Sequence, residues 1–110
     1  MDETYEVIIG ELAIQQIDDI AIYIARNSSE LAAEKVYNGI NKAIDGLCKM
    51  PESHGRLRYI ESNDPIFRRV NVWKYVIVFT VDEDAKIVNV VDVSHSSQDS
   101  QRLIDRLSTP

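Results

Sequence analysis

The chain has 110 residues, of which 45% are hydrophobic and 27% are charged, and its net charge at pH 7 is −6. This length suits one domain with a single core, and the composition is far from that of a disordered chain. The negative charge argues against a general nucleic-acid binder, because neutralising phosphates requires surplus Lys and Arg. We therefore expect one soluble domain that folds on its own.

Neither a membrane segment nor a secretion signal is visible in the chain. No stretch approaches the roughly 20 consecutive apolar residues that a membrane helix needs, and Met1-Asp2-Glu3 is acidic where a secretory signal would be basic. We expect a cytoplasmic protein without membrane association. The single cysteine, Cys48, permits neither an internal disulfide nor a cysteine-based metal cluster, so the sequence predicts no metal and no cofactor.

The first predicted elements are a strand and a helix. Residues 5–9 are β-branched or aromatic except for Glu6, and they end at Gly10, which favours a short strand. From Ile17 to Ile24, apolar residues recur at the spacing of a helix with one buried stripe, which predicts a helix over about residues 11–26. Its polar positions are expected to face water: Gln15, Gln16, Asp18 and Asp19.

A second helix is predicted directly after the first. The polar residues 27–30 can form a turn and an N-cap. Apolar positions between Val36 and Leu47 then repeat at helical spacing as far as Met50, whose helical conformation the following proline disfavours. With so short a link the two helices form an antiparallel hairpin over about residues 11–50. Gly39 and Gly46 lie inside the second helix and suggest that another element approaches closely.

The second half of the chain is predicted to be mainly β. Residues 51–65 contain two prolines and a glycine without any period, which indicates a long loop. A meander over about residues 66–94 follows, with strands at 67–72, 75–81 and 86–93. The middle strand is apolar on both faces and is expected to be central.

The predicted fold class follows from this order of elements. It is an α+β domain, with an N-terminal strand and an antiparallel helical hairpin packed on a mainly antiparallel four-stranded sheet. Leu103, Ile104 and Leu107 suggest a short C-terminal helix. One domain is expected over residues 1–110.

The two histidines are the first candidates for chemistry. His54 lies in the long loop and His95 just past the last predicted strand, and neither has an acidic residue at metal-ligand spacing. The unperturbed pKa of histidine is near neutrality, so His95 could act as an acid or a base. Alternatively, it caps the strand end and hydrogen-bonds the backbone.

Basic residues gather in one segment of this acidic chain. Residues 56–74 carry a local charge of +3, while the remainder carries −9. Arg68 and Arg69 are adjacent on a strand and point to opposite faces of the sheet. With Arg56, Arg58 and Lys74, the solvent-facing arginine could form a cationic patch for phosphate or an acidic peptide. Alternatively, arginines on an edge strand only prevent edge-to-edge aggregation.

The order of these elements resembles the ParE/RelE superfamily of bacterial toxin-antitoxin systems, whose ParE-like members include plasmid stabilisation proteins. The resemblance runs along nearly the whole chain. It rests on residues 20–25 (Ile-Ala-Ile-Tyr-Ile-Ala), 67–79 (Phe-Arg-Arg-Val-Asn-Val-Trp-Lys-Tyr-Val-Ile-Val-Phe) and 91–99 (Val-Asp-Val-Ser-His-Ser-Ser-Gln-Asp). The last two look like the strand pair and the "Leu-His-Gly-Arg-Arg-Asp" ending of the family.

The resemblance implies one of two activities. ParE-like members act on DNA gyrase, and RelE-like members are ribosome-dependent endoribonucleases that cleave mRNA. Nuclease activity would use Arg69, His95 and His54, but the acidic total charge and the scarcity of further basic groups favour the ParE-like toxin. The departure at Ser96-Ser97, where glycine and arginine are usual, leaves a third alternative, a catalytically silent binding module.

The resemblance also implies a protein partner, a cognate antitoxin. Its disordered tail would fold on the toxin as a helix across the hairpin and a strand at the sheet edge. The residues expected to contact this antitoxin or the target are Arg56, Arg58, Arg68, Arg69, Lys74, Tyr75 and His95. The hairpin face and an exposed edge strand are also candidate surfaces for a homodimer.

Overall fold

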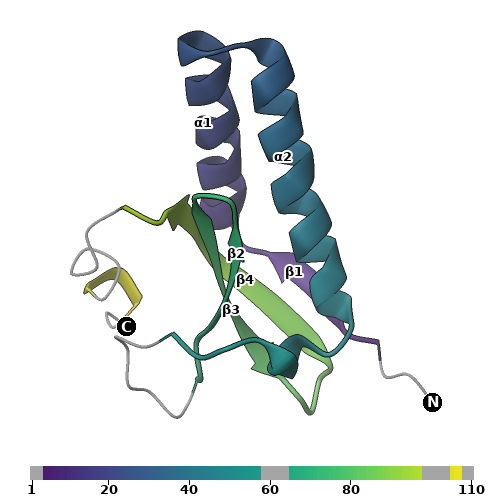
Figure 1. The fold of residues 1–110 in the computed structure, drawn as a ribbon. Coiled ribbons are helices and arrows are strands. Elements are labelled where there is room, and N and C mark those ends of the chain that lie inside the picture. Colours follow the sequence, from purple (N-terminus) through teal and green to yellow (C-terminus); the bar gives the residue numbers. More distant parts are fainter. Residues whose placement is uncertain (1–3, 58–64, 98–104, 108–110) are drawn as a thin grey trace.

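The computed structural model describes residues 4–57, 65–97 and 105–107. These residues form two layers, which are a pair of helices and a four-stranded sheet (Figure 1). The helices cover one face of the sheet. The predicted order of strand, helical hairpin and three further strands is confirmed. Figure 1 shows the two helices side by side, with the link between them at the end farthest from the sheet.

The helices and strands have well-defined bounds. They are β1 (Glu6–Ile9), α1 (Glu11–Asn27), α2 (Glu30–Asp45), β2 (Arg68–Val72), β3 (Tyr75–Asp82) and β4 (Ile87–His95). Two single-turn 3-10 helices, Gly46–Cys48 and Pro51–Ser53, follow α2. The second of them lies within the predicted long loop, whose residues 58–64 are outside the described ranges.

The sheet has the strand order β1-β4-β3-β2. β2, β3 and β4 form an antiparallel meander, and β1 pairs with β4 in parallel. Two parallel neighbours require a long crossover, and here the helical hairpin and the meander lie between them in the chain. The central position predicted for residues 75–81 is confirmed, and β4 is the second central strand.

A β-bulge in β4 changes which of its side chains face the helices. Val78 of β3 pairs with Asp92, and the next residue, Phe79, pairs with Val90, so Val91 is an additional residue in β4. Such a residue shifts the alternation of side chains between the two faces by one position. Val93 therefore faces the helices, as Val90 does, and both are fully or almost fully buried in the core beneath them.

The start of α2 confirms the predicted N-cap. The hydroxyl oxygen of Ser29 accepts a hydrogen bond of 3.0 Å from the backbone N–H of Ala32. Such a cap contributes about 1 kcal/mol, because it gives a partner to a backbone donor that the helix itself leaves free.

The predicted end of the second helix at Met50 is wrong. The α-helix ends at Asp45, and the chain tightens into the 3-10 turn Gly46–Cys48 before Met50 takes a left-handed conformation with φ of 49°. Leu47 is nevertheless completely buried, so the apolar period continues through the 3-10 turn. The periodicity that predicted the helix does not distinguish the two kinds of turn at its end.

The two glycines of the second predicted helix have different environments. A Cβ atom at Gly39 would lie 2.5 Å from two ring atoms of Trp73, which confirms the predicted close approach at this position. A Cβ atom at Gly46 would have nothing within 4 Å, so the same prediction is wrong there.

The main core lies between the helices and the sheet. Its fully or almost fully buried members include Ile40 and Ile44 of α2 and also Ile77 and Phe79 of β3. A smaller apolar cluster lies on the other face of the sheet, around Val78. Its further members are Leu57, Phe67, Val76, Val91 and Leu107.

A short helical turn, residues 105–107, is described near the C-terminus. Leu107 packs against the smaller cluster, which agrees with a short C-terminal helix. Leu103 and Ile104, on which that prediction also rested, lie outside the described residues.

Candidate functional site

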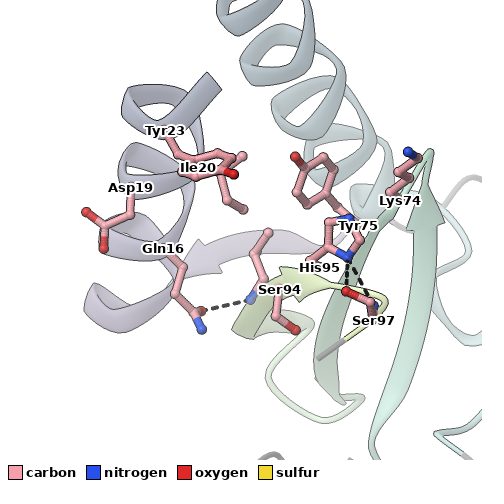
Figure 2. Close-up of a pocket in the computed structure, with 10 residues that line it drawn as sticks. Gln16, Asp19, Ile20, Tyr23, Lys74, Tyr75, Ser94, His95 and Ser97 are labelled. Carbon is pink, nitrogen blue, oxygen red and sulfur yellow. Dashed lines mark hydrogen bonds between the residues drawn. The ribbon is translucent and has the colours of Figure 1, made fainter. Parts of the chain in front are cut away.

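A groove with a volume of about 930 Å³ lies between α1 and the adjoining ends of β3 and β4 (Figure 2). The β2–β3 turn contributes Lys74, and the chain beyond β4 contributes Ser97. The remaining lining residues are Gln16, Asp19, Ile20 and Tyr23 of α1, Tyr75 of β3, and Val93, Ser94 and His95 of β4. The groove thus collects aromatic rings, hydroxyl groups, one amide, one lysine and one carboxylate.

His95 lies in this groove because of the bulge in β4. It is the last residue of β4, two positions after Val93, so its side chain is on the face that the helices cover. Its ring meets that of Tyr75, its partner in the strand register, in a T-shaped contact with 5.5 Å between ring centroids. The sequence placed His95 just past the strand, whereas the structure includes it in the strand.

The hydrogen bonds of His95 define its tautomer. Its Nδ1 accepts a hydrogen bond of 3.0 Å from the backbone N–H of Ser97, and the Ser97 hydroxyl oxygen lies 2.7 Å from the same nitrogen. A neutral ring that accepts at Nδ1 carries its proton on Nε2. Nδ1 thus bonds the backbone at the strand end, as the second interpretation expected, and the side chain also lines the groove.

Arg69 is not in the groove. It neighbours Arg68 on β2 and pairs with Val78, whose side chain belongs to the cluster on the face away from the helices. His95 lies on the other face. The structure therefore separates Arg69 from His95, the two groups on which the nuclease hypothesis was based.

Arg68 and His54 are together at the opposite end of β2 from Lys74. Arg68 donates a hydrogen bond of 2.8 Å to the backbone oxygen of His54, whose ring contacts Phe79 edge to face at 5.8 Å between centroids. Arg56 pairs with Arg68 in an isolated β-bridge. These contacts attach the long loop to the sheet.

The predicted cationic residues consequently do not share one surface. Arg56 and Arg68 lie at one end of β2, Lys74 lies beyond the other end, and Arg69 points to the other face. Arg58 is outside the described residues. Of the predicted binding residues, the groove brings together Lys74, Tyr75 and His95.

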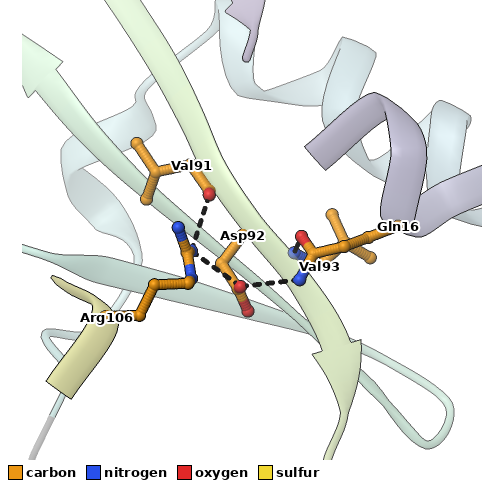
Figure 3. A network of polar contacts seen from close by, with 5 residues as sticks. All are labelled: Gln16, Val91, Asp92, Val93 and Arg106. Atoms are coloured by element: carbon orange, nitrogen blue, oxygen red, sulfur yellow. Dashed lines mark hydrogen bonds and ion pairs between the residues drawn. The ribbon is translucent and has the colours of Figure 1, made fainter. Parts of the chain in front are cut away.

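A polar network that was not predicted from the sequence adjoins the groove through Gln16 and Val93 (Figure 3). Gln16 was expected to face water, but its Nε2 donates to Oδ1 of the completely buried Asp92 at 2.8 Å, and its Oε1 accepts from the backbone N–H of Val93 at 2.8 Å. Arg106 donates to the same Asp92 oxygen at 2.7 Å and to the backbone oxygen of Val91 at 2.8 Å. The network joins α1, β4 and the C-terminal turn.

One signal in the sequence could have revealed this network. Asp92 is the only acidic residue between Ile87 and His95, a segment otherwise rich in valine. A carboxylate inside a strand that is buried on both faces needs partners with hydrogen-bond donors. The residues that meet this need are Gln16, which is 76 positions away, and Arg106, which is 14 positions away, and the sequence alone does not identify them.

A second charged cluster lies by the β3–β4 turn. The phenol of Tyr5 donates a hydrogen bond of 2.9 Å to Glu52, and this bond raises the pKa of Tyr5. The hydrogen bond between Glu52 and Glu83 lowers the pKa of Glu52 and raises that of Glu83. The Lys86 ammonium lies 5.2 Å from the centre of the Tyr5 ring. The cluster links the 3-10 turn at Pro51–Ser53 to β1 and to the β3–β4 turn.

Two further observations concern metals and membranes. Within residues 4–57, 65–97 and 105–107, no three or more His, Cys, Asp or Glu side chains are grouped as metal ligands. In the same ranges, no helix has the length and apolar character needed to cross a membrane.

Comparison with known proteins identifies relatives of this chain. Residues 7–100 match the model of a family described as the ParE toxin of the type II toxin-antitoxin system, parDE. None of the curated proteins matches the chain.

Several solved structures share this fold. The chromosomal ParDE toxin-antitoxin system from P. aeruginosa is similar with a TM-score of 0.70 and 14% identity, over 84% of this chain and 97% of that chain. The RelBE2 toxin-antitoxin complex from Mycobacterium tuberculosis has a TM-score of 0.61 and 15% identity, over 89% and 100%. The archaeal RelE-RelB complex from Pyrococcus horikoshii has a TM-score of 0.60 and 14% identity, over 87% and 99%.

Proposed function

The chain belongs to the family of ParE toxins of type II toxin-antitoxin systems, and we propose that it binds and inhibits DNA gyrase in the cytoplasm and is neutralised by a cognate antitoxin. The observation that supports binding over bond cleavage is the separation of Arg69 from His95 by the sheet. General-base catalysis and charge stabilisation must converge on one phosphodiester. Two groups on opposite faces cannot do this together.

The composition of the groove also suits a protein ligand. Ile20, Tyr23 and Tyr75 supply apolar and aromatic area, and Gln16 and Ser94 supply polar groups that can orient a partner. Tyrosine side chains are enriched in protein interfaces, because they bury a large area and keep one hydrogen-bonding group. Tyr23 is 67% exposed at the rim of the groove and is therefore available to a partner.

The antitoxin is proposed to fold on this toxin. A disordered tail that becomes ordered on binding can cover a large surface, with a helix on the hairpin and a strand on the sheet edge. β1 and β2 are the edge strands of the sheet. A strand can be added to either edge through backbone hydrogen bonds.

The gyrase proposal is tested with purified protein in a DNA supercoiling assay. We expect inhibition of supercoiling or accumulation of cleaved DNA, and relief of both when the antitoxin is added. Lys74→Glu, which reverses a charge in the groove, should weaken inhibition, whereas Lys49→Glu, an exposed lysine outside the groove, should not. Supercoiling that continues unchanged at a stoichiometric excess of toxin would exclude gyrase as the target.

The ribosome-dependent nuclease is the second candidate. It is favoured by the Nε2 proton of His95, which is available in a groove that also holds Lys74 and Tyr75. This candidate predicts cleavage of mRNA on translating ribosomes and a loss of at least about tenfold for His95→Ala, because an acid–base group typically contributes roughly a hundredfold or more. Intact mRNA would exclude it. Unchanged growth after induced expression would contradict both toxin activities and favour the silent binding module.

A further inference from the structure

Trp73 adopts an unusual conformation at the tip of the β2–β3 turn. Its φ is 52°, in the left-handed region that bulky residues rarely occupy. Its side chain is 58% exposed. Strained conformations of this kind persist only where the surrounding structure maintains them, and they concentrate at functional positions.

The surrounding structure that maintains Trp73 is the surface of α2. The indole ring lies against Gly39, where a Cβ atom would be only 2.5 Å from the ring atoms Cζ3 and Cη2. Glycine in the middle of a helix is destabilising relative to alanine. The left-handed conformation of Trp73 and the glycine at position 39 are both unfavourable locally. Together they keep the indole ring on the helix and in contact with water.

One lysine contacts this ring, and two more lie close to it in the fold or in the chain. The Lys35 ammonium lies 5.9 Å from the centre of the indole, within cation–π range. Lys42 is three residues beyond Gly39 and Lys35 four residues before it, so both lie on the same side of α2 as the ring. Lys74 follows Trp73 directly in the turn.

The acidic residues of α2 lie elsewhere on the helix. Glu30, Glu34 and Asp45 are at positions turned by about 120° or more from Gly39 around the helix axis. The side that carries Trp73 is therefore basic on a protein whose net charge is −6. None of Lys35, Gly39, Lys42 and Trp73 lines the groove of the proposed function.

We propose that this Trp73 surface, made of Trp73, Lys35, Gly39 and Lys42, is a second binding site, which takes an acidic segment of a protein partner. Carboxylates of the partner pair with the lysines, and an apolar side chain packs on the exposed part of the indole. The charge of the surface is opposite to that of such a segment, and an aromatic ring beside cations is typical of interface anchors.

An acidic protein segment fits this surface better than a nucleic acid does. A polyanion with one charge at every nucleotide would be repelled by a protein with an isoelectric point near 4.8, and a few lysines release few counterions. An acidic peptide presents a limited number of charges together with apolar groups. The surface lies on the hairpin, where the proposed function also places the antitoxin helix, and the inference is independent of the gyrase or the ribosome as target.

Trp73 itself provides the measurement, because it is the only tryptophan of the chain. The folded protein is titrated with a short synthetic peptide in which glutamates surround a single leucine, and the emission of Trp73 is followed. We expect a saturable change that a peptide with lysines in place of the glutamates does not cause. No saturable change with the glutamate peptide would overturn the proposal.

Variants locate the site through the fluorescence anisotropy of the labelled glutamate peptide. Lys35→Glu and Lys42→Glu should each weaken binding about tenfold, because a like charge would then face the peptide. Lys49→Glu, the same change at an exposed lysine outside the Trp73 surface, should leave binding unchanged. Circular dichroism shows whether each variant is folded.

Two outcomes of these measurements contradict the proposal. Equal weakening by Lys49→Glu would mean that only the total charge of the protein matters. Tighter binding of a single-stranded oligothymidine than of the glutamate peptide would assign the surface to nucleic acid instead.

Discussion

A hydrogen bond of 2.8 Å joins Gln16 Nε2 to Asp92 Oδ1 across 76 positions of the chain. The same side-chain amide accepts from the backbone N–H of Val93. β1 pairs with β4 only as far as Val90, so Gln16 bonds a β4 donor beyond the end of the neighbouring strand. One side chain of α1 therefore completes the hydrogen bonding of the sheet edge and lines the groove.

Replacing Gln16 should reduce stability more than its position on a helix surface suggests. Gln16→Ala leaves the Val93 N–H and one oxygen of the buried Asp92 without this partner, and we expect the free energy of unfolding to fall by about 1–3 kcal/mol. Gln15→Ala removes only the exposed contact with Asp19 and should change it by less than about 0.5 kcal/mol. Urea unfolding of both variants is the measurement. Equal, small effects would show that the network contributes no stability.

Arg106 and Asp92 should behave as a coupled pair. The Asp92 side chain is fully buried and that of Arg106 is 28% exposed, so Arg106→Met removes the cation from a buried carboxylate. We expect a loss of about 2 kcal/mol, below the 3–5 kcal/mol typical of completely buried pairs, because water reaches the arginine. Asp92→Asn should lower the free energy of unfolding less in the Arg106→Met background than in the original chain. Strict additivity in this double-mutant cycle would refute the coupling.

Substitution by alanine should have different effects on stability at Gly39 and at Gly46. Gly46 has helical φ and ψ angles and open space around its Cα, so Gly46→Ala should raise stability by about 0.5–1 kcal/mol. Gly39→Ala should lack this gain, because its methyl group must displace the Trp73 ring. Thermal unfolding measures the gain in stability of Gly46→Ala. The displacement of the Trp73 ring in Gly39→Ala is measured as a red shift of tryptophan emission. A Gly39→Ala variant with unchanged emission would contradict the observed position of the Trp73 ring against Gly39.

Glu52 and Glu83, the paired carboxyl groups by the β3–β4 turn, should have different pKa values. The hydrogen bond with Glu52 and the charge of Glu52 raise the pKa of Glu83, while the hydrogen bonds with Glu83 and Tyr5 lower the pKa of Glu52. A raised pKa in the folded state means that the contribution of Glu83 to stability is complete below the ordinary glutamate pKa and is lost as pH rises through the raised value. The contribution of Glu52 is also stabilising but has the opposite pH dependence, because it is complete above the ordinary glutamate pKa and is lost as pH falls through its lowered pKa.

NMR titration of the carboxyl carbons tests this assignment. Glu52→Gln should return the Glu83 pKa toward the ordinary range, because both of its leading causes are removed. Glu34→Gln, on the distant α2 helix, serves as the control and should leave the titration of Glu83 unchanged. A Glu83 pKa that persists at its raised value in Glu52→Gln would assign the shift to another cause.

Much of the fold was predictable because it depends on local patterns. The apolar stripe of α1, the Ser29 cap and the doubly buried run of β3 each act within a few residues, and all three were confirmed. The end of α2 was not predictable, since the burial of Leu47 continues the helical period through a 3-10 turn. The apolar pattern records burial, not the type of helical turn.

The site was less predictable because it depends on long-range register. Alternation correctly put Arg68 and Arg69 on opposite faces, but the face of His95 depends on the extra residue Val91 in β4. A bulge is a property of two paired strands, and neither strand shows it alone. The role of Gln16 was hidden for a similar reason, because its partners become neighbours only in the folded chain.

The parallel pairing of β1 with β4 has a consequence for the synthesis of this protein. β1 leaves the ribosome before β4, and until β4 is translated Val7 and Ile9 have no Val88 and Val90 to pack with. The helical hairpin can form early from local contacts, but the nonlocal pairing that completes the core comes late and slowly. The groove also needs the end of β4, so a nascent chain has no assembled groove until its final strand is free. Binding in the groove therefore requires that translation has passed β4.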